Sequence, residues 1–263
     1  MTPSAVEATS TLERVIRRDR AVLALALAIL TTIAVVYLVR SAAAMQAMSP
    51  DMVMPQTSWA SDWASLFLMW AVMMVAMMLP SAAPVILLVL AMYRRRGDRR
   101  AVASAYSFVA GYILAWTVFS AAAAAAQVGL NRAALIGMDM HLSRPALSGV
   151  VLIVAGVYQW LPIKNVCLSH CQSPLGILTR YWREGPTGAL VTGVRHGAYC
   201  VGCCWMLMAV LFVVGVMNLL WVTALAAFVL VEKLVHVGKV VTRVAGAALT
   251  GWGSYLLALA LVT

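Results

Sequence analysis

Charged side chains are scarce in this chain. Only 11% of its 263 residues are Asp, Glu, Lys or Arg, and the acidic ones number nine. Hydrophobic residues make up 63% of the chain, so the composition is that of a protein solvated mostly by lipid. The composition excludes a separate soluble domain and indicates one integral membrane unit.

Motifs of soluble catalysis are also missing. The chain has no GxxxxGK[ST] phosphate loop, no HExxH zinc motif and no Gly-x-Ser-x-Gly nucleophile elbow. Four histidines are too few for a haem-binding or histidine-rich oxidase core. We therefore expect a binding or transport protein more than an enzyme, and enzymatic redox chemistry would have to be based on thiols.

Long apolar runs predict an all-α, polytopic membrane helix bundle, since backbone polar groups in lipid must be paired within the segment. The count is about seven transmembrane helices, with six as the fallback because the fourth and sixth runs are short. Residues 1–20 are expected to form a short cytosolic tail and residues 21–263 a single bundle, in a multi-pass protein of the bacterial inner (plasma) membrane. The predicted spans are Ala21–Val39, Trp63–Tyr93, Ala101–Val128, Leu147–Leu161, Ala198–Val216, Leu219–Leu234 and Val244–Val262.

The net charge of +10 is distributed unevenly. Under a seven-span count, one side holds only Arg40, Arg132 and Arg144, and all other basic clusters fall on the opposite side. The positive-inside rule then puts the N-terminus in the cytosol. No basic stripe with interleaved aromatic residues exists, so the lipid bilayer is an expected partner and nucleic acid is not.

Methionine is concentrated in the second span, in the segment MWAVMMVAMMLP from Met69 to Pro80. At 100° per residue its methionines share one half of the helix with Trp70, and the opposite half carries Ala71, Val72 and Val75. Such a face suits a flexible core filler or a thioether path for a soft metal. The candidate metal-contacting methionines are Met73, Met74, Met77 and Met78. Met45, Met48, Met52 and Met54 in the preceding loop form a further candidate thioether site.

The five cysteines fall in two short clusters. CLSHC places Cys167 and Cys171 one helical turn apart, with His170 adjacent. If the second cluster is one continuous helix, four potential ligands share an arc of about 100°. They are His196, Cys200, Cys203 and Cys204. The positive-inside orientation puts both clusters near the cytosolic face, so we expect them to meet.

Thiolates and thioethers prefer Cu(I), with zinc as the competitor at the thiolates. Disulfides are not expected on a reducing face. Packing of cysteine as a small hydrophobe and a dithiol redox pair remain alternatives. A lysine near the thiols, such as Lys164, would favour thiolates. For Glu232 and Lys233, adjacent at the end of the sixth span, a mutual salt bridge is the expectation, although Glu232 could instead face the cysteines.

Several ordered motifs carry a family resemblance: AMMLPSAAP at 76–84, GVYQWLPIKNVCLSHCQSP at 156–174, HGAYCVGCCWMLM at 196–208, GVMNLLW at 215–221, and Glu232–Lys233. Over roughly residues 59–251 the chain resembles a bacterial family of predicted metal-binding integral membrane proteins of unknown function. The resemblance implies a polytopic membrane protein that binds metal, without an established reaction. The positions that match its motifs are Met77, Met78, Pro80, Lys164, Cys167, Cys171, Cys200, Cys203, Cys204, Glu232 and Lys233.

The sequence thus predicts a Cu(I) transport or membrane chaperone protein, which holds copper through thioethers and a cytosolic Cys/His site. A soluble copper donor or acceptor protein is a further expected partner. The alternatives are a membrane thiol-disulfide oxidoreductase and an accessory scaffold for a membrane enzyme.

Overall fold

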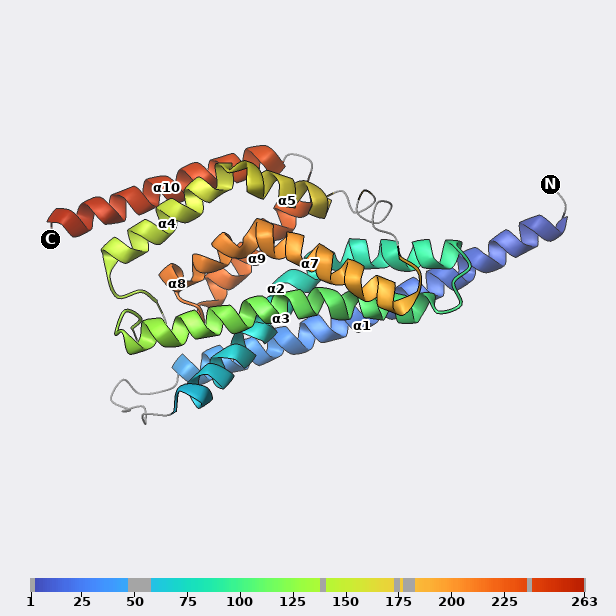
Figure 1. The fold of residues 1–263 in the computed structure, drawn as a ribbon, viewed down its shortest axis with the longest axis horizontal. Coiled ribbons are helices and arrows are strands. Elements are labelled where there is room, and N and C mark those ends of the chain that lie inside the picture. Colours follow the sequence, from blue (N-terminus) through green and yellow to red (C-terminus); the bar gives the residue numbers. More distant parts are fainter. Residues whose placement is uncertain are drawn as a thin grey trace.

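The computed structural model describes residues 3–46, 58–137, 141–172, 176, 183–235 and 238–262. Helices dominate these residues, which contain no β-strand beyond a single isolated bridge. The all-α fold expected from the composition is confirmed (Figure 1). The helices are α1 (Pro3–Gln46), α2 (Trp59–Arg95), α3 (Ala101–Arg132), α4 (Pro145–Trp160), α5 (Pro162–Gln172), α7 (Gly185–Ala209), α8 (Leu211–Val214), α9 (Leu219–Leu234) and α10 (Gly238–Val262).

Each of the seven predicted spans coincides with a helix, but the helices differ in their capacity to cross a membrane. Within the described residues, five are long and apolar enough, and α4 with α5 would make a sixth as one span bent by 63°. The seventh, α9, has only 16 residues. A 16-residue helix is about 24 Å long, somewhat short of a hydrocarbon core of about 30 Å.

Several boundaries differ from those expected, most of all at the starts of α7 and α1. Helix α7 begins at Gly185, 13 residues before the predicted start of the fifth span at Ala198. Its first half contains Gly188, Thr192, Gly193 and Arg195, which lower the hydropathy without breaking the helix. At the N-terminus, α1 starts at Pro3 and continues to Gln46, so residues 3–20 are the first turns of the first long helix.

The helices form two groups that run roughly parallel to one long axis (Figure 1). In one group α1 packs along α2, α2 along α3, and α3 along α7; in the other α4 packs along α10. Helices α5 and α9 lie between the groups. Helix α1 begins at one end of the bundle, and α10 ends at the opposite end (Figure 1).

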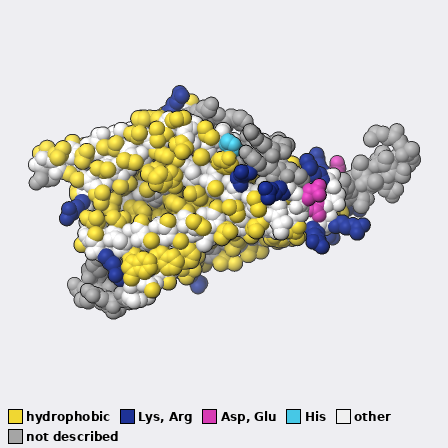
Figure 2. All heavy atoms as spheres, in the orientation of Figure 1, with side chains coloured by type: hydrophobic (Ala, Val, Ile, Leu, Met, Phe, Trp, Pro, Cys, Tyr) yellow, Lys and Arg dark blue, Asp and Glu magenta, His cyan; other side chains and the backbone are white. Residues whose placement is uncertain are grey.

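Basic side chains are also distributed along this axis. Figure 2 shows Lys and Arg gathering near the end at which α1 begins, while apolar side chains cover most of the remaining visible face and isolated basic residues mark the opposite end. Arg94, in the last turn of α2, forms an ion pair with Asp19 that joins α2 to α1. The asymmetry agrees with the segregation of basic residues expected from the sequence.

Glycine lets α3 and α7 approach closely. A Cβ on Gly193 would overlap the carbonyl of Phe108, and a Cβ on Gly111 would overlap that of Leu190. At Gly197 an added Cβ would lie 2.7 Å from the Cβ of Ala115. Small residues at helix crossings allow such contacts in lipid-like environments. This contact places the side chains of α3 directly against the cysteine-bearing face of α7.

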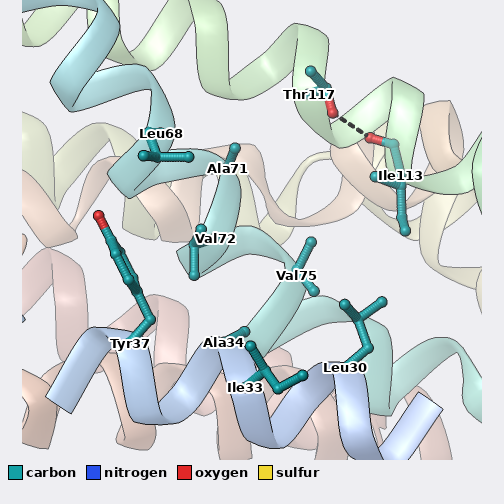
Figure 3. Close-up of a pocket in the computed structure, with 10 residues that line it drawn as sticks. All are labelled: Leu30, Ile33, Ala34, Tyr37, Leu68, Ala71, Val72, Val75, Ile113 and Thr117. Carbon is teal, nitrogen blue, oxygen red and sulfur yellow. Dashed lines mark hydrogen bonds between the residues drawn. The ribbon is translucent and has the colours of Figure 1, made fainter. Parts of the chain in front are cut away.

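The half of α2 that lies opposite the methionines packs on α1 around an apolar hollow of about 340 Å³ (Figure 3). Figure 3 shows the side chains that line the hollow, which come from α1, α2 and α3. The residues that line the hollow are Leu30, Ile33, Ala34, Tyr37, Leu68, Ala71, Val72, Val75, Ile113 and Thr117. This half of α2 therefore contacts other helices, and the methionine half faces the core.

Candidate metal centre

Four thiols from two helices meet in the core. Cys203 Sγ lies 3.2 Å from Cys204 Sγ on α7 and 3.9 Å from Cys171 Sγ on α5. Cys200 has all three as neighbours. These four side chains are at most 6% exposed. Because α7 is continuous from Gly185 to Ala209, the predicted clustering of its cysteines on one face is realised.

A lysine from α9 enters this cluster. Lys233 Nζ donates hydrogen bonds to Cys200 Sγ and to Ser81 Oγ, each at 2.9 Å. Tyr112 of α3 completes the surroundings, with its hydroxyl 3.1 Å from Cys200 Sγ and 3.2 Å from the Met78 carbonyl oxygen. The thiol cluster, defined here as Cys171, Cys200, Cys203 and Cys204, is therefore bounded by one ammonium and two hydroxyl groups.

The expected salt bridge between Glu232 and Lys233 does not form. Glu232 instead accepts hydrogen bonds from Lys164 Nζ, at 2.8 and 3.1 Å, and from Thr242 Oγ1, at 2.7 Å. Lys164 also donates to Gln159 and is fully buried. Adjacent residues on a helix point in directions about 100° apart, so Glu232 and Lys233 face different neighbours. Lys233 is thus the cation beside the thiols, whereas Lys164 forms an ion pair with the Glu232 carboxylate.

The methionine face of α2 runs into the thiol cluster. Met69, Met73, Met74, Met77 and Met78 are all buried, with at most 7% exposure. They span ten residues of helix, or about 13.5 Å along its axis. At the end of this face, the carbonyl of Met78 accepts hydrogen bonds from Tyr112 and from Ser81, the two hydroxyls that border Cys200 and Lys233. Thioethers and thiols therefore belong to one buried region.

The remaining candidate residues have different surroundings. His196 is buried on the cysteine face of α7, where its ring packs against Phe108 and Tyr112. His170 stacks on Tyr199, with its Nδ1 2.7 Å from the Val166 carbonyl oxygen.

Cys167 is only half-buried, and its sulfur lies 2.9 Å from the position that a Cβ on Gly202 would take. Thus α5 contributes Cys171 to the thiol cluster, with Cys167 beside α7 at its edge. Of the predicted loop site, Met48, Met52 and Met54 lie outside the described residues, and so does the side chain of Met45.

Sequence reasoning missed two of the groups around the thiols. Tyr112 and Ser81 lie on α3 and α2, far from either cysteine cluster along the chain. The sequence offered one indication of Ser81, which lies between Pro80 and Pro84. Prolines leave helix carbonyls without N–H donors, and a nearby hydroxyl can donate to such a carbonyl. The sequence offered no indication of Tyr112, because its role depends on the close contact of α3 with α7.

Residues 67–256 match the model of the PpoB2 family, described as copper chaperones. The match covers well over half of the chain and includes the methionine face and both cysteine clusters. The chain belongs to the PpoB2 copper chaperone family. Neither a curated protein nor a solved structure matches it.

Membership in the PpoB2 family supports copper as the bound metal and a role in copper handling, and it agrees with the metal-binding character implied by the resemblance. Soft sulfur donors are the side chains expected for such a cargo. In the described part of the chain, no three His, Cys, Asp or Glu side chains are arranged as a complete metal site. The closest approach to one is the pairing of sulfurs within the thiol cluster.

Proposed function

We propose that this protein is an integral membrane Cu(I) chaperone or transporter whose cargo site is the thiol cluster. The observation that carries the proposal is the 3.9 Å separation of Cys171 Sγ and Cys203 Sγ, which lie on different helices. Metal–thiolate bonds of about 2.3 Å place two sulfurs on one ion about 4 Å apart. One ion between these sulfurs would join α5 to α7.

Cu(I) suits this arrangement better than zinc. A structural zinc site closes with four ligands in a tetrahedron, whereas two thiolates are sufficient for Cu(I). The described residues bring four sulfurs close together without arranging three of them as a complete site. Incomplete coordination is also useful in a chaperone, because a partner's ligand must be able to displace those of the donor.

The methionine face supplies a path to the cargo site. Neutral thioethers hold Cu(I) less strongly than thiolates, so transfer from Met73, Met74, Met77 and Met78 to the cysteines would be downhill. We propose that copper moves along this face towards the cytosolic side of the bacterial inner membrane, where a soluble protein accepts it. The order of donors supports this direction of transfer, and the basic end of the bundle supports this orientation.

Metal analysis with X-ray absorption on anaerobically purified protein tests the cargo site. We expect near-stoichiometric, sulfur-coordinated copper in the wild type and its loss when Cys200, Cys203 and Cys204 are all replaced by serine. Trp59→Phe, on the exposed end of α2, is the matched control and should retain copper. Metal-free wild-type protein with a reversible disulfide would instead support the thiol oxidoreductase.

A further inference from the structure

Lys233 is a buried cation that needs a negatively charged group nearby. Its side chain is 9% exposed, and its ammonium is hydrogen-bonded to Cys200 Sγ and Ser81 Oγ, both at 2.9 Å. An unpaired charge at this depth is strongly unfavourable. Of these two partners, the hydroxyl is neutral and only the sulfur becomes an anion under ordinary conditions.

The carboxylate of the neighbouring residue, Glu232, does not balance the charge of Lys233. Glu232 forms its ion pair with Lys164, which is 0% exposed, and accepts a further hydrogen bond from Thr242. The other buried acid among the described residues, Asp19, forms an ion pair with Arg94 at the far end of α2. Among the described side chains, the buried region around α9 therefore contains two lysines and one glutamate, and the thiol cluster is the group that can balance its charge.

We propose that Lys233 selects the charge of the bound metal, so that the thiol cluster prefers a monovalent soft ion to a divalent one. This inference rests on the proposed function. Each thiol that binds metal releases its proton, so two thiolates contribute −2 and Lys233 contributes +1. A monovalent ion brings the sum to zero, whereas a divalent ion leaves a buried charge of +1.

A divalent ion could reach neutrality only by recruiting a third thiolate. In the described residues no three His, Cys, Asp or Glu side chains are arranged to hold one ion, so a third thiolate would have to move before it could bind. Ser81 strengthens the preference, because its hydroxyl accepts a hydrogen bond from Lys233 and donates one to the Met78 carbonyl. The ammonium is thus held at the thiols and cannot turn away when the cluster changes charge.

Ag(I) and Cd(II) separate charge from softness, since both are soft ions that thiolates bind well and they differ in charge. We would measure the Kd of each ion by anaerobic competition titration on purified full-length protein in detergent, comparing wild type with Lys233→Met and Lys233→Arg. We expect Lys233→Met to lower the ratio Kd(Cd)/Kd(Ag) at least about tenfold, because removing +1 from a low-dielectric site favours the divalent ion. Lys233→Arg keeps the charge and should stay near the wild-type ratio.

Ser81→Ala provides a second measurement that leaves Lys233 in place. It should lower the same ratio in the same direction, by a smaller factor, and it also serves if Lys233→Met fails to fold. An unchanged ratio in either variant, with both ions still bound, overturns charge selection while leaving copper handling intact. Wild-type protein that binds neither Ag(I) nor Cu(I) overturns the proposed function itself.

Discussion

Cys171 Sγ and Cys203 Sγ lie 3.9 Å apart although 32 positions separate them in the chain. The contact depends on the break between α4 and α5, where the helix axis turns by 63° at Leu161. Proline at the first position of α5 lacks the N–H that would continue the α4 hydrogen-bond ladder. The bend directs α5 onto α7, and the site therefore depends on α5 remaining there.

Cys171→Ser should weaken Cu(I) binding at least about tenfold, because the variant removes the only sulfur that α5 places in the thiol cluster. Cys167→Ser is the matched control, since Cys167 lies on the same helix but is half-buried at the edge. Its effect should be several-fold smaller. Competition with a Cu(I)-specific chromophoric chelator measures both. Equal losses in the two variants would contradict the assignment of Cys171 as the inner ligand.

Glu232→Gln should lower the free energy of unfolding by about 3–5 kcal/mol, because it leaves Lys164 charged and buried without its partner. The double variant Glu232→Gln with Lys164→Met removes both charges and should recover part of the loss. Asp62→Asn is the control, since Asp62 and Arg132 form a largely exposed pair worth about 1 kcal/mol or less. Unfolding in denaturing detergent measures all three. A Glu232→Gln variant as stable as Asp62→Asn would contradict the role of the buried ion pair.

Replacing Met73 and Met77 together by leucine separates packing from transfer. Leucine has nearly the volume of methionine, so each change should alter stability by less than about 1.5 kcal/mol. If the thioethers carry copper, uptake into vesicles should fall several-fold while the Kd of the thiol cluster stays the same. Leucine at Val72 and Val75, which line the apolar hollow on the opposite half, is the control. Unchanged uptake in the methionine variant would show that the methionine face serves packing and does not transfer copper.

Gly193→Ala should separate α3 from α7 and thereby disturb Tyr112 beside Cys200, since the new Cβ overlaps the Phe108 backbone. We expect a loss of several kcal/mol of stability, typical of severe overpacking against backbone. Gly129→Ala on α3 meets nothing within 4 Å and should be neutral or stabilising by up to about 1 kcal/mol. Thermal unfolding in detergent compares them, and a Gly193→Ala variant as stable as Gly129→Ala would show that the close contact is dispensable.

Composition and residue spacing were sufficient to predict the helical class and which side chains share a face on each helix of the site. Hydropathy is a property of segments, and angular position on a helix follows from spacing, so the burial of Met73 and Met77 and the common face of Cys200 and Cys204 could be predicted. Basic residues likewise revealed the two ends of the bundle, since they avoid its apolar middle.

Only the tertiary structure decided which partners these side chains meet. Spacing shows that Glu232 and Lys233 point in different directions, but not that one meets Lys164 and the other Cys200. Those choices depend on the 63° bend before α5 and on the glycine contact of α3 with α7. The proline marks where the chain bends, but the direction in which α5 then runs depends on its packing against α7, and the glycine contact likewise joins segments far apart in the chain. Burying a charge without a partner is strongly unfavourable, which favours the observed pairings.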